Sequence, residues 1–114
     1  MRASSAPIAV EGATGYVYKS VGADQLRLHV FSVDSADVVA LRPAIVFFFG
    51  GGWAQGSVTQ FVPQAKYLAR RGMVAIVPDY RVLDRHGTTP FEAIADAKSA
   101  IRWVRAGRPS PLLP

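Results

Sequence analysis

Hydrophobic and polar positions change their period several times along the chain, and each period predicts a different element. Strict alternation over residues 26–31, Leu-Arg-Leu-His-Val-Phe, predicts a strand with one wet face that carries Arg27 and His29. Residues 15–19 are rich in aromatic and β-branched side chains, and the turn sequence Gly-Ala-Asp at residues 22–24 separates the two runs. We therefore expect an antiparallel hairpin.

Two continuous apolar runs come next, at residues 44–49 (Ala-Ile-Val-Phe-Phe-Phe) and residues 73–77 (Met-Val-Ala-Ile-Val). Runs of this kind are typical of parallel strands that are buried on both faces. Between them, residues 61–71 place apolar side chains at helical spacing and end at Gly72, a residue that often follows a helix. Strand, helix and strand in this order predict a parallel βαβ unit with a right-handed crossover.

A second helix is predicted after a loop at residues 79–88. Thr89 can cap it, Pro90 suits its first position, and Glu92 completes a capping box. The helix should run to about Arg105 or Ala106. Apolar residues at helical spacing predict its buried face: Phe91, Ile94, Ala97, Ile101 and Val104.

These elements predict an α/β fold, with an antiparallel hairpin followed by a parallel βαβ unit and a further helix. Residues 1–13 are small and polar, and we interpret them as a flexible lead-in. Residues 14–106 form one domain in this interpretation. Residues 107–114 are expected to be an irregular tail, because prolines interrupt any helix or strand there.

Composition supports a folded chain and excludes several classes of protein. Of the 114 residues, 50% are hydrophobic and 18% are charged, which favours a packed core over intrinsic disorder. The absence of cysteine excludes disulfides and thiolate metal sites. No apolar run approaches the roughly 20 residues that span a bilayer, and the start lacks the apolar core of a signal peptide. We expect a soluble protein of unknown compartment.

The net charge of +5 and the sequence pI near 10.1 raise the question of a nucleic-acid partner. The basic residues do not form a stripe, since Arg70 and Arg71 close one predicted helix and Arg102 and Arg105 lie near the end of another. Cations near helix C-termini are favoured by the helix dipole. No nucleic-acid partner is predicted.

The candidate chemistry lies in the run Gly50-Gly51-Gly52-Trp53, which follows the first buried strand. Open α/β sheets bind their ligands at the carboxyl ends of their strands. Glycine permits unusual dihedral angles and leaves no side chain in the way, so such a loop can aim successive backbone N–H groups into one cavity.

This run and its surroundings resemble a known family. Phe49-Gly50-Gly51-Gly52-Trp53 is similar to the His-Gly-Gly-Gly-Trp segment of α/β-hydrolase fold esterases, and Asp79-Tyr80-Arg81-Val82 is similar to their Asp-Tyr-Arg-Leu segment. The resemblance is to the hormone-sensitive-lipase-like and the feruloyl or acetyl esterase-like carboxylesterases. It runs from about Tyr16 to Ala106 and covers the N-terminal part of such a sheet.

The resemblance implies an ester hydrolase, a small-molecule ester as substrate and no cofactor. Gly51 and Gly52 would donate their N–H groups to the oxyanion, while Gly50 would shape the turn. Trp53 would pack beneath the loop and, with Gly50, contribute to substrate binding. The segment at residues 79–81, Asp79, Tyr80 and Arg81, would hold loops together.

The chain departs from the family pattern in two respects. Phe49 stands where the family has a histidine and has no polar atom with which to orient the loop. The nucleophile elbow Gly-x-Ser-x-Gly occurs nowhere in the sequence, so neither a nucleophile nor an acid or base can be carried over. We therefore expect the chain by itself to be inactive.

Other interpretations remain open. Ser57, Asp84 and His86 could meet at one end of the sheet as an unusual triad, although a lone serine and a lone loop histidine are usually solvated. His29 is a weaker candidate still. A non-catalytic truncated hydrolase could instead act as an interaction module. In the strand order that the resemblance implies, the strand at residues 44–49 (Ala44 to Phe49) would have an open edge that favours self-association.

Dinucleotide binding is the third interpretation. A glycine loop after a buried strand, followed by a helix, a strand and the acid Asp79, is similar to a βαβ nucleotide site. The fingerprint Gly-x-Gly-x-x-Gly counted from Gly50 requires glycine at position 55, which is Gln55, and Gly56 comes one residue late. The predicted helix also begins several residues after the loop, away from where a pyrophosphate would lie.

Overall fold

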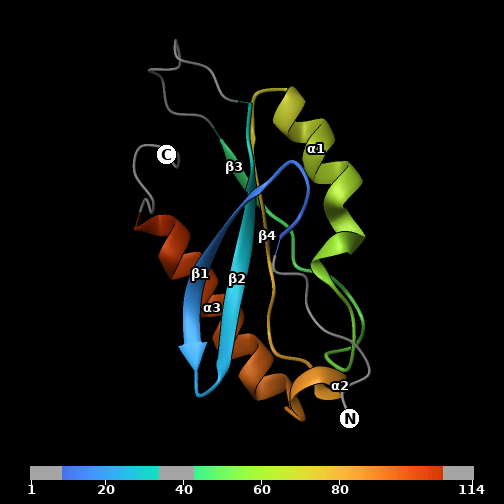
Figure 1. The fold of residues 1–114 in the computed structure, drawn as a ribbon, viewed down its shortest axis with the longest axis vertical. Coiled ribbons are helices and arrows are strands. Elements are labelled where there is room, and N and C mark those ends of the chain that lie inside the picture. The colour runs from blue at the N-terminus through green and yellow to red at the C-terminus, as the bar shows by residue number, and fades with distance from the viewer. Residues whose placement is uncertain (1–8, 34–42, 107–114) are drawn as a thin grey trace.

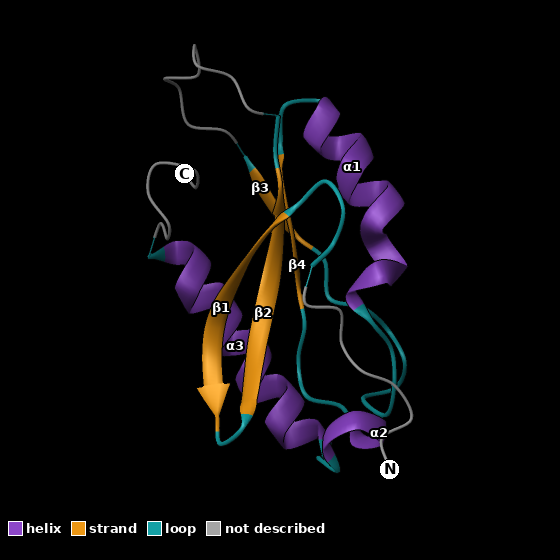
Figure 2. Ribbon diagram, viewed as in Figure 1, coloured by secondary structure: helices purple, strands orange, loops and turns teal. Residues whose placement is uncertain are grey.

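The computed structural model describes residues 9–33 and 43–106 as a mixed sheet with helices (Figures 1 and 2). The predicted tail lies outside these residues, as do residues 1–8 of the predicted lead-in. The strands are β1 (Thr14–Val21), β2 (Asp24–Phe31), β3 (Ala44–Val46) and β4 (Val74–Pro78). The helices are the 3₁₀ helix η1 (Val58–Phe61), α1 (Val62–Arg70), α2 (Leu83–His86) and α3 (Pro90–Arg105).

The sheet has the order β1-β2-β4-β3. Strands β1 and β2 form the predicted antiparallel hairpin, and β2 also pairs antiparallel with β4. Strands β3 and β4 are parallel, with Ile45 opposite Ala75, and α1 connects them. The predicted fold class is therefore confirmed, and β3 lies at the edge of the described sheet.

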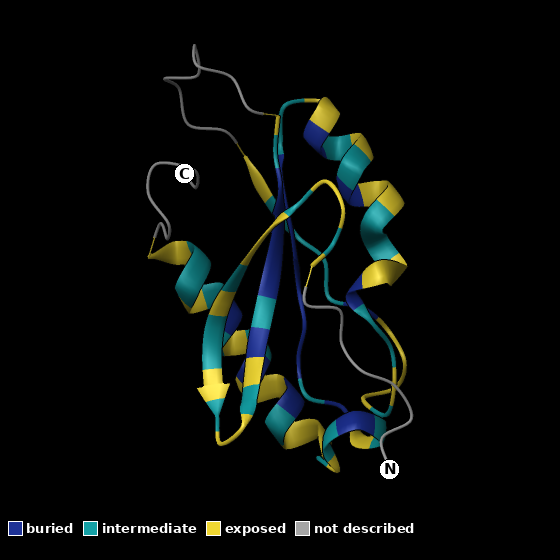
Figure 3. Cartoon of the chain, in the orientation of Figure 1, coloured by how far each residue is buried: buried dark blue, intermediate teal, exposed yellow. Residues whose placement is uncertain are grey.

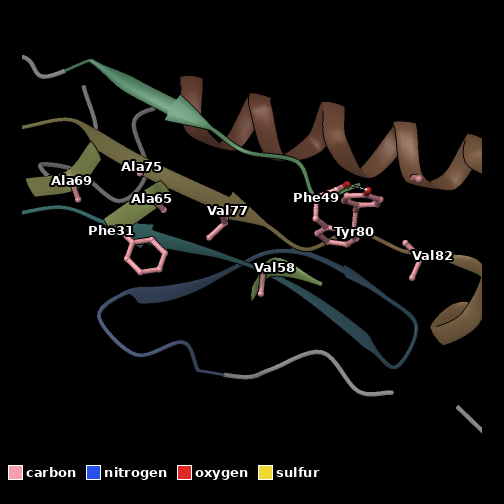
Figure 4. Packing of buried hydrophobic residues seen from close by; sticks show 10 residues of the cluster. Phe31, Phe49, Val58, Ala65, Ala69, Ala75, Val77, Tyr80 and Val82 are labelled. Carbon is pink, nitrogen blue, oxygen red and sulfur yellow. Dashed lines mark hydrogen bonds between the residues drawn. The ribbon is translucent and has the colours of Figure 1, made fainter. Parts of the chain in front are cut away.

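Helices α1 and α3 cover opposite faces of the sheet (Figure 1). The alternation of side chains along β4 distributes them between the two faces. Ala75 and Val77 join Phe31 in a cluster that includes Ala65 of α1, part of which Figure 4 shows. Val74 and Ile76 join the other cluster, with Leu28, Val30 and Ala100 of α3. Strands β2 and β4 supply the core of both layers.

The prediction of one wet face on β2 is wrong. His29 is only 1% exposed, and five of the eight β2 residues are buried (Figure 3). The reason is tertiary, because β2 lies between β1 and β4 and is covered on both sides. Arg27 lies on the same strand, two residues nearer the hairpin turn, and remains half-buried.

Strand β3 is shorter and less buried than predicted. It ends at Val46 instead of Phe49, and none of its three residues is fully buried. The Phe47 N–H still donates to Ile76 O at 2.8 Å, but the following backbone groups bond to side chains instead of to a strand. An edge position leaves one side of β3 without a neighbouring strand.

Local sequence signals identified the helix ends correctly. Helix α1 ends at Arg70, and Gly72 has φ +94, the conformation for which glycine is favoured. Thr89 and Glu92 form the predicted capping box at the start of α3, where Thr89 N donates to Glu92 Oε1 at 2.7 Å. Helix α3 runs to Arg105, as predicted.

The predicted buried face of α3 is wrong in its N-terminal part, although Val104 packs against the core as predicted. Phe91 is 82% exposed and Ile94 is 40% exposed, whereas Ala93, Asp96 and Ala100 are fully buried. Small alanines let the helix approach the sheet closely, and the buried carboxylate is held by ion pairs that helical periodicity does not reveal.

The segment at residues 79–88 is not entirely a loop, because it contains the single-turn helix α2. Gly87 ends this turn at φ +65, and its N–H donates to Leu83 O at 2.8 Å. The Val82 N–H donates to His86 Nδ1 at 3.1 Å, so a side chain takes up an N–H group at the start of the turn. The helices among the described residues include none that is long and apolar enough to cross a membrane.

Candidate functional site

The glycine run forms an exposed loop between β3 and η1, with backbone angles that few residues adopt. Gly51 has φ +149, and Gly52 and Trp53 have φ +65 and +68. A Cβ atom on Gly51 would lie 1.9 Å from the Gln55 carbonyl oxygen, which no side chain can accommodate. At Gly52 a Cβ atom would meet nothing within 4 Å. Glycine is therefore required sterically at position 51 and is favoured by the backbone conformation at both positions.

Phe49 anchors the start of the loop. Its ring stacks on Tyr80 with centroids 4.1 Å apart and planes 10° apart, and the Tyr80 hydroxyl donates to the Phe49 carbonyl (Figure 4). Burial raises the pKa of the Tyr80 hydroxyl, so the group stays protonated and can donate this hydrogen bond. Phe49 thus contributes ring packing at a position where the resemblance leads us to expect a histidine.

Gln60 of η1 holds the next residue. The Gly50 N–H donates to Gln60 Oε1 at 2.8 Å, and Gln60 Nε2 donates to the Gly50 carbonyl at 3.4 Å. Helix η1 is itself capped by Ser57, whose Oγ accepts from Thr59 N at 3.4 Å. One side-chain amide therefore satisfies both backbone groups of an exposed glycine.

Arg85 of α2 holds the end of the loop through a buried ion pair. Its guanidinium donates to both carboxylate oxygens of Asp79, at 2.8 and 3.1 Å, and to the Gly56 carbonyl at 3.1 Å. Arg85 and Asp79 are each about 5% exposed, and such forked pairs are the stronger kind of charged hydrogen bond. The pair ties the loop to the end of β4.

Between these anchors, several backbone N–H groups have no hydrogen-bond partner among the described residues, including those of the two central glycines. Within the described residues, the N–H groups of Gly51 and Gly52 make no hydrogen bond, and both glycines are exposed. The Gly51 carbonyl accepts from the N–H groups of Ala54 and Gln55 at 3.2 and 3.3 Å. The loop therefore presents free donors at Gly51 and Gly52, while the carbonyls of Gly50 and Gly51 are engaged.

Trp53 lies over the same end of the sheet but is 43% exposed. Its ring centroid is 6.2 Å from that of Tyr80, with the planes 60° apart. The Trp53 and Ala54 carbonyls accept from Leu83 N and Asp84 N at 3.2 and 2.9 Å, so backbone contacts attach this side of the loop to α2.

The possible triad of Ser57, Asp84 and His86 has none of the hydrogen bonds that it needs. Ser57 Oγ bonds to Thr59, and His86 Nδ1 accepts from Val82 N. Asp84 Oδ1 is buried without a hydrogen-bond partner. Burial lowers the pKa of His86, with a further contribution from Arg85. The three side chains have separate structural surroundings.

Arg81, expected to hold loops, binds a carboxylate on helix α3 to which sequence reasoning assigned no role. Asp96 of α3 is fully buried and accepts from Arg81 N, Nε and Nη2 at 2.9 Å each and from Lys19 Nζ at 2.8 Å. Burial alone would raise the pKa of Asp96, but hydrogen bonds from Arg81 and Lys19 outweigh it and lower the pKa below the ordinary value. This cluster joins β1, α3 and the segment after β4.

His29 is a further buried polar residue near this end of the sheet. Neither ring nitrogen has a hydrogen-bond partner, and burial lowers its pKa below 6.5. A neutral imidazole is the form that such surroundings favour.

Sequence reasoning assigned no role to Gln60, Arg85 or Asp96. Arg85 and Asp79 lie six residues apart, but no period identifies them as a pair before α2 is known. Gln60 lies ten residues from its partner on a different element. Asp96 carries a signal in retrospect, since it is an acid at the spacing of the buried alanines Ala93 and Ala100.

Comparison with known proteins identifies the family. Residues 33–108 match the sequence model of the BD-FAE family. The chain therefore belongs to the BD-FAE family of α/β-hydrolase esterases.

A solved structure and curated relatives agree with this assignment. The chain superimposes on the esterase Est2 of Thermogutta terrifontis with a TM-score of 0.78 and 52% identity, over 85% of this chain and 36% of that one. Structures of that esterase include propionate-bound and butyrate-bound forms. The chain is 36% identical to carboxylesterase NlhH of Mycobacterium tuberculosis over 54% of this chain. It is 38% identical to an esterase of Gibberella moniliformis over 62% of this chain.

The matched part is a small fraction of each relative. The chain covers 19% of carboxylesterase NlhH and 22% of the Gibberella moniliformis esterase. It also covers 10% of the neuroligin-like protein glit-1 of Caenorhabditis elegans, to which it is 36% identical over 69% of its own length.

Proposed function

We propose that these residues form the oxyanion-binding part of a carboxylic ester hydrolase, with the N–H groups of Gly51 and Gly52 as the donors. The observation that carries the proposal is the pair of free N–H groups in a loop anchored at Phe49, Gly50 and Gly56. Ester hydrolysis builds negative charge on the carbonyl oxygen, and donors fixed in advance stabilise that charge without reorganising. Gly50 would shape the turn, and the half-exposed Trp53 would line the acyl or alcohol side.

The 114 residues alone are proposed to have no esterase activity, because they lack the Gly-x-Ser-x-Gly elbow that presents the nucleophile. In a complete active site, a serine would attack the ester carbonyl, the alcohol would leave, and water would hydrolyse the acyl-enzyme. The short carboxylates bound to the Thermogutta terrifontis esterase support a short-chain acyl group as substrate.

Hydrolysis of p-nitrophenyl acetate tests both parts of this proposal. The purified chain should show no turnover above the rate of the Ser57→Ala variant. A chimera in which this chain replaces the matched segment of the Thermogutta terrifontis esterase should be active. Gly51→Ala in the chimera keeps the N–H group but should displace it, because the Cβ atom would collide with the Gln55 carbonyl oxygen. It should lower kcat by up to about 10²-fold, the usual effect of losing one oxyanion donor, with little change in KM.

Gly22→Ala is the matched control for the backbone. Gly22 has φ +58 in the hairpin turn, with nothing within 4 Å of a Cβ atom, and lies away from the glycine loop. Turnover by the isolated chain that Ser57→Ala abolishes would contradict the absence of a nucleophile. An active chimera that Gly51→Ala leaves unchanged would contradict the assignment of the donors.

The edge of β3 supports a second function, association with another copy of this chain. Within the described sheet no strand pairs with the outer side of β3, and open edges pair with other strands. A largely apolar groove of about 480 Å³ lies beside this edge against α1. It is lined by Ile45, Phe47, Pro63, Gln64, Tyr67 and Leu68.

Light scattering after size exclusion tests this association. The chain should form a dimer as its concentration rises, and Ile45→Lys on β3 should abolish it. Val17→Lys on β1, the opposite edge strand, is the matched control because Val17 is 41% exposed. A chain that remains monomeric at every concentration would contradict self-association.

A further inference from the structure

Two carbonyl groups determine where the free donors of the glycine loop point. A peptide group is planar and trans, so the carbonyl of one residue and the N–H of the next lie in one plane and point in opposite directions. Fixing the Gly50 carbonyl therefore fixes the direction of the Gly51 N–H. Fixing the Gly51 carbonyl does the same for the Gly52 N–H.

The two planes are held by different means. The Gly51 carbonyl accepts backbone N–H groups of Ala54 and Gln55 within the loop itself, at 3.2 and 3.3 Å. The Gly50 carbonyl accepts from the side chain of Gln60 at 3.4 Å, on η1. The direction of the Gly51 N–H thus depends on a side chain ten residues away.

Gln60 suits this task because its amide carries a donor and an acceptor side by side. Its Oε1 accepts from the Gly50 N–H at 2.8 Å while its Nε2 donates to the Gly50 carbonyl. The two contacts restrain the peptide groups on both sides of Gly50. Glycine has the largest conformational freedom of any residue, so an exposed glycine needs such restraint to keep one conformation.

The neighbouring residue offers no alternative. Phe49 has no side-chain polar atom, and its carbonyl is taken by the Tyr80 hydroxyl. A Cβ atom at Gly50 would meet only Gln60 Oε1, at 3.6 Å, among atoms within 4 Å. Packing therefore does little to orient Gly50, and the hydrogen bonds of Gln60 carry the restraint.

We propose that Gln60 is the positioning residue for the Gly51 N–H, holding the peptide group between Gly50 and Gly51 so that this donor faces the oxyanion. The catalytic meaning of this assignment rests on the proposed function. The hydrogen-bond geometry itself can be tested in the 114-residue chain without any activity.

Amide hydrogen exchange and chemical shifts, measured by NMR on the ¹⁵N-labelled chain, provide that test. Gln60→Ala should speed exchange of the Gly50 N–H by up to about tenfold, the ratio for a hydrogen bond worth about 1.4 kcal/mol, and should shift the Gly51 resonance. Gln60→Glu keeps an acceptor for the Gly50 N–H but has no donor for its carbonyl. It should therefore keep the protection of Gly50 and still shift Gly51.

Gln25→Ala is the matched control, since Gln25 is an exposed glutamine on β2 whose side chain bonds to Arg27. It should change neither glycine, and the exchange of Ile76 in β4 should stay constant in every variant that keeps the fold. Equal Gly50 exchange in the native chain and in Gln60→Ala, with Ile76 still protected, would overturn the proposal.

The active chimera supplies a second measurement that does not depend on NMR of the short chain. Gln60→Ala should lower kcat with little change in KM, because a misdirected donor weakens binding of the transition state more than that of the ester. An inactive chimera would count against the proposed function, while the exchange data would still decide the role of Gln60. If the chimera is active and Gln60→Ala leaves its kcat unchanged, the positioning role of Gln60 would be overturned.

Discussion

The two faces of the sheet are made from the same two central strands but treat their polar groups differently. On the α3 face, the buried carboxylate of Asp96 accepts four hydrogen bonds from Arg81 and Lys19. On the α1 face, the ring nitrogens of His29 have no partner, and the loop at its end presents the free N–H groups of Gly51 and Gly52.

The difference separates structural from chemical roles. A buried charge with all its partners fixes neighbouring elements in place and has no capacity left for a ligand. Free donors on an anchored loop are available to a ligand, and their anchors determine where they point. The candidate oxyanion-binding loop therefore belongs to the α1 face, while the polar groups of the α3 face hold neighbouring elements in place.

The largest expected effect is on the α3 face. Asp96→Ala should lower the free energy of unfolding by about 3 kcal/mol, because it leaves Arg81 and Lys19 without their buried partner. Urea unfolding followed by circular dichroism measures this loss. Asp84→Ala in α2 should cost less than about 1 kcal/mol, since Asp84 Oδ1 has no hydrogen bond to lose. Equal costs for the two variants would contradict the role assigned to the ion pairs of Asp96.

The glycine loop should respond next. Gly51→Ala should cost about 2 kcal/mol, because its Cβ atom would collide with the Gln55 carbonyl oxygen. Gly52→Ala and Gly22→Ala should cost about 1 kcal/mol each, since only the left-handed conformation opposes them there. The same unfolding experiment compares the three, and a Gly51→Ala variant as stable as Gly22→Ala would show that the loop is not sterically constrained.

Two tyrosine hydroxyls allow a matched test of the two faces. Tyr80→Phe keeps the stacking on Phe49 but removes the donor to its carbonyl, and should cost about 1 kcal/mol. Tyr18→Phe removes the donor to the Asp79 carbonyl at 2.5 Å and should cost a similar amount. Only Tyr80→Phe should shift the Gly50 and Gly51 amide resonances; a shift from Tyr18→Phe alone would reverse the assignment of the anchors.

The smallest effect near neutral pH is the dependence of stability on protonation. The pKa of His29 is lowered in the folded state, so the unfolded chain binds the proton first as pH falls below 6.5. Stability should fall by under about 1 kcal/mol between pH 7 and 6 and continue falling until the folded-state pKa is passed. Urea unfolding at several pH values measures this slope, which His29→Phe should reduce.

Asp96 should act in a more acid range. Its folded-state pKa is lowered below 3.8, so its contribution to stability is present above that value and is lost as pH falls through the folded-state pKa. Asp96→Asn should reduce the loss of stability at acid pH and leave the change in stability between pH 7 and 6 intact. An unchanged loss of stability at acid pH in Asp96→Asn would contradict the role of this carboxylate.

The amino-acid sequence by itself determined the features that depend on neighbours along the chain. The capping box at Thr89 and Glu92 and the helix stop at Gly72 follow from local hydrogen bonding and allowed dihedral angles. The order of hairpin, βαβ unit and helix follows from the period of apolar positions. The glycine run could be recognised as a candidate site for the same reason, since its residues are adjacent.

Tertiary structure alone decided which side chains are buried and which residues hold the loop. His29 is buried because β2 lies inside the sheet, and Phe91 is exposed because α3 turns its alanines and Asp96 toward the strands. Gln60 and Arg85 reach the loop across 10 and 29 residues of chain. Such contacts depend on the three-dimensional approach of separate elements, and no local period or propensity encodes that approach.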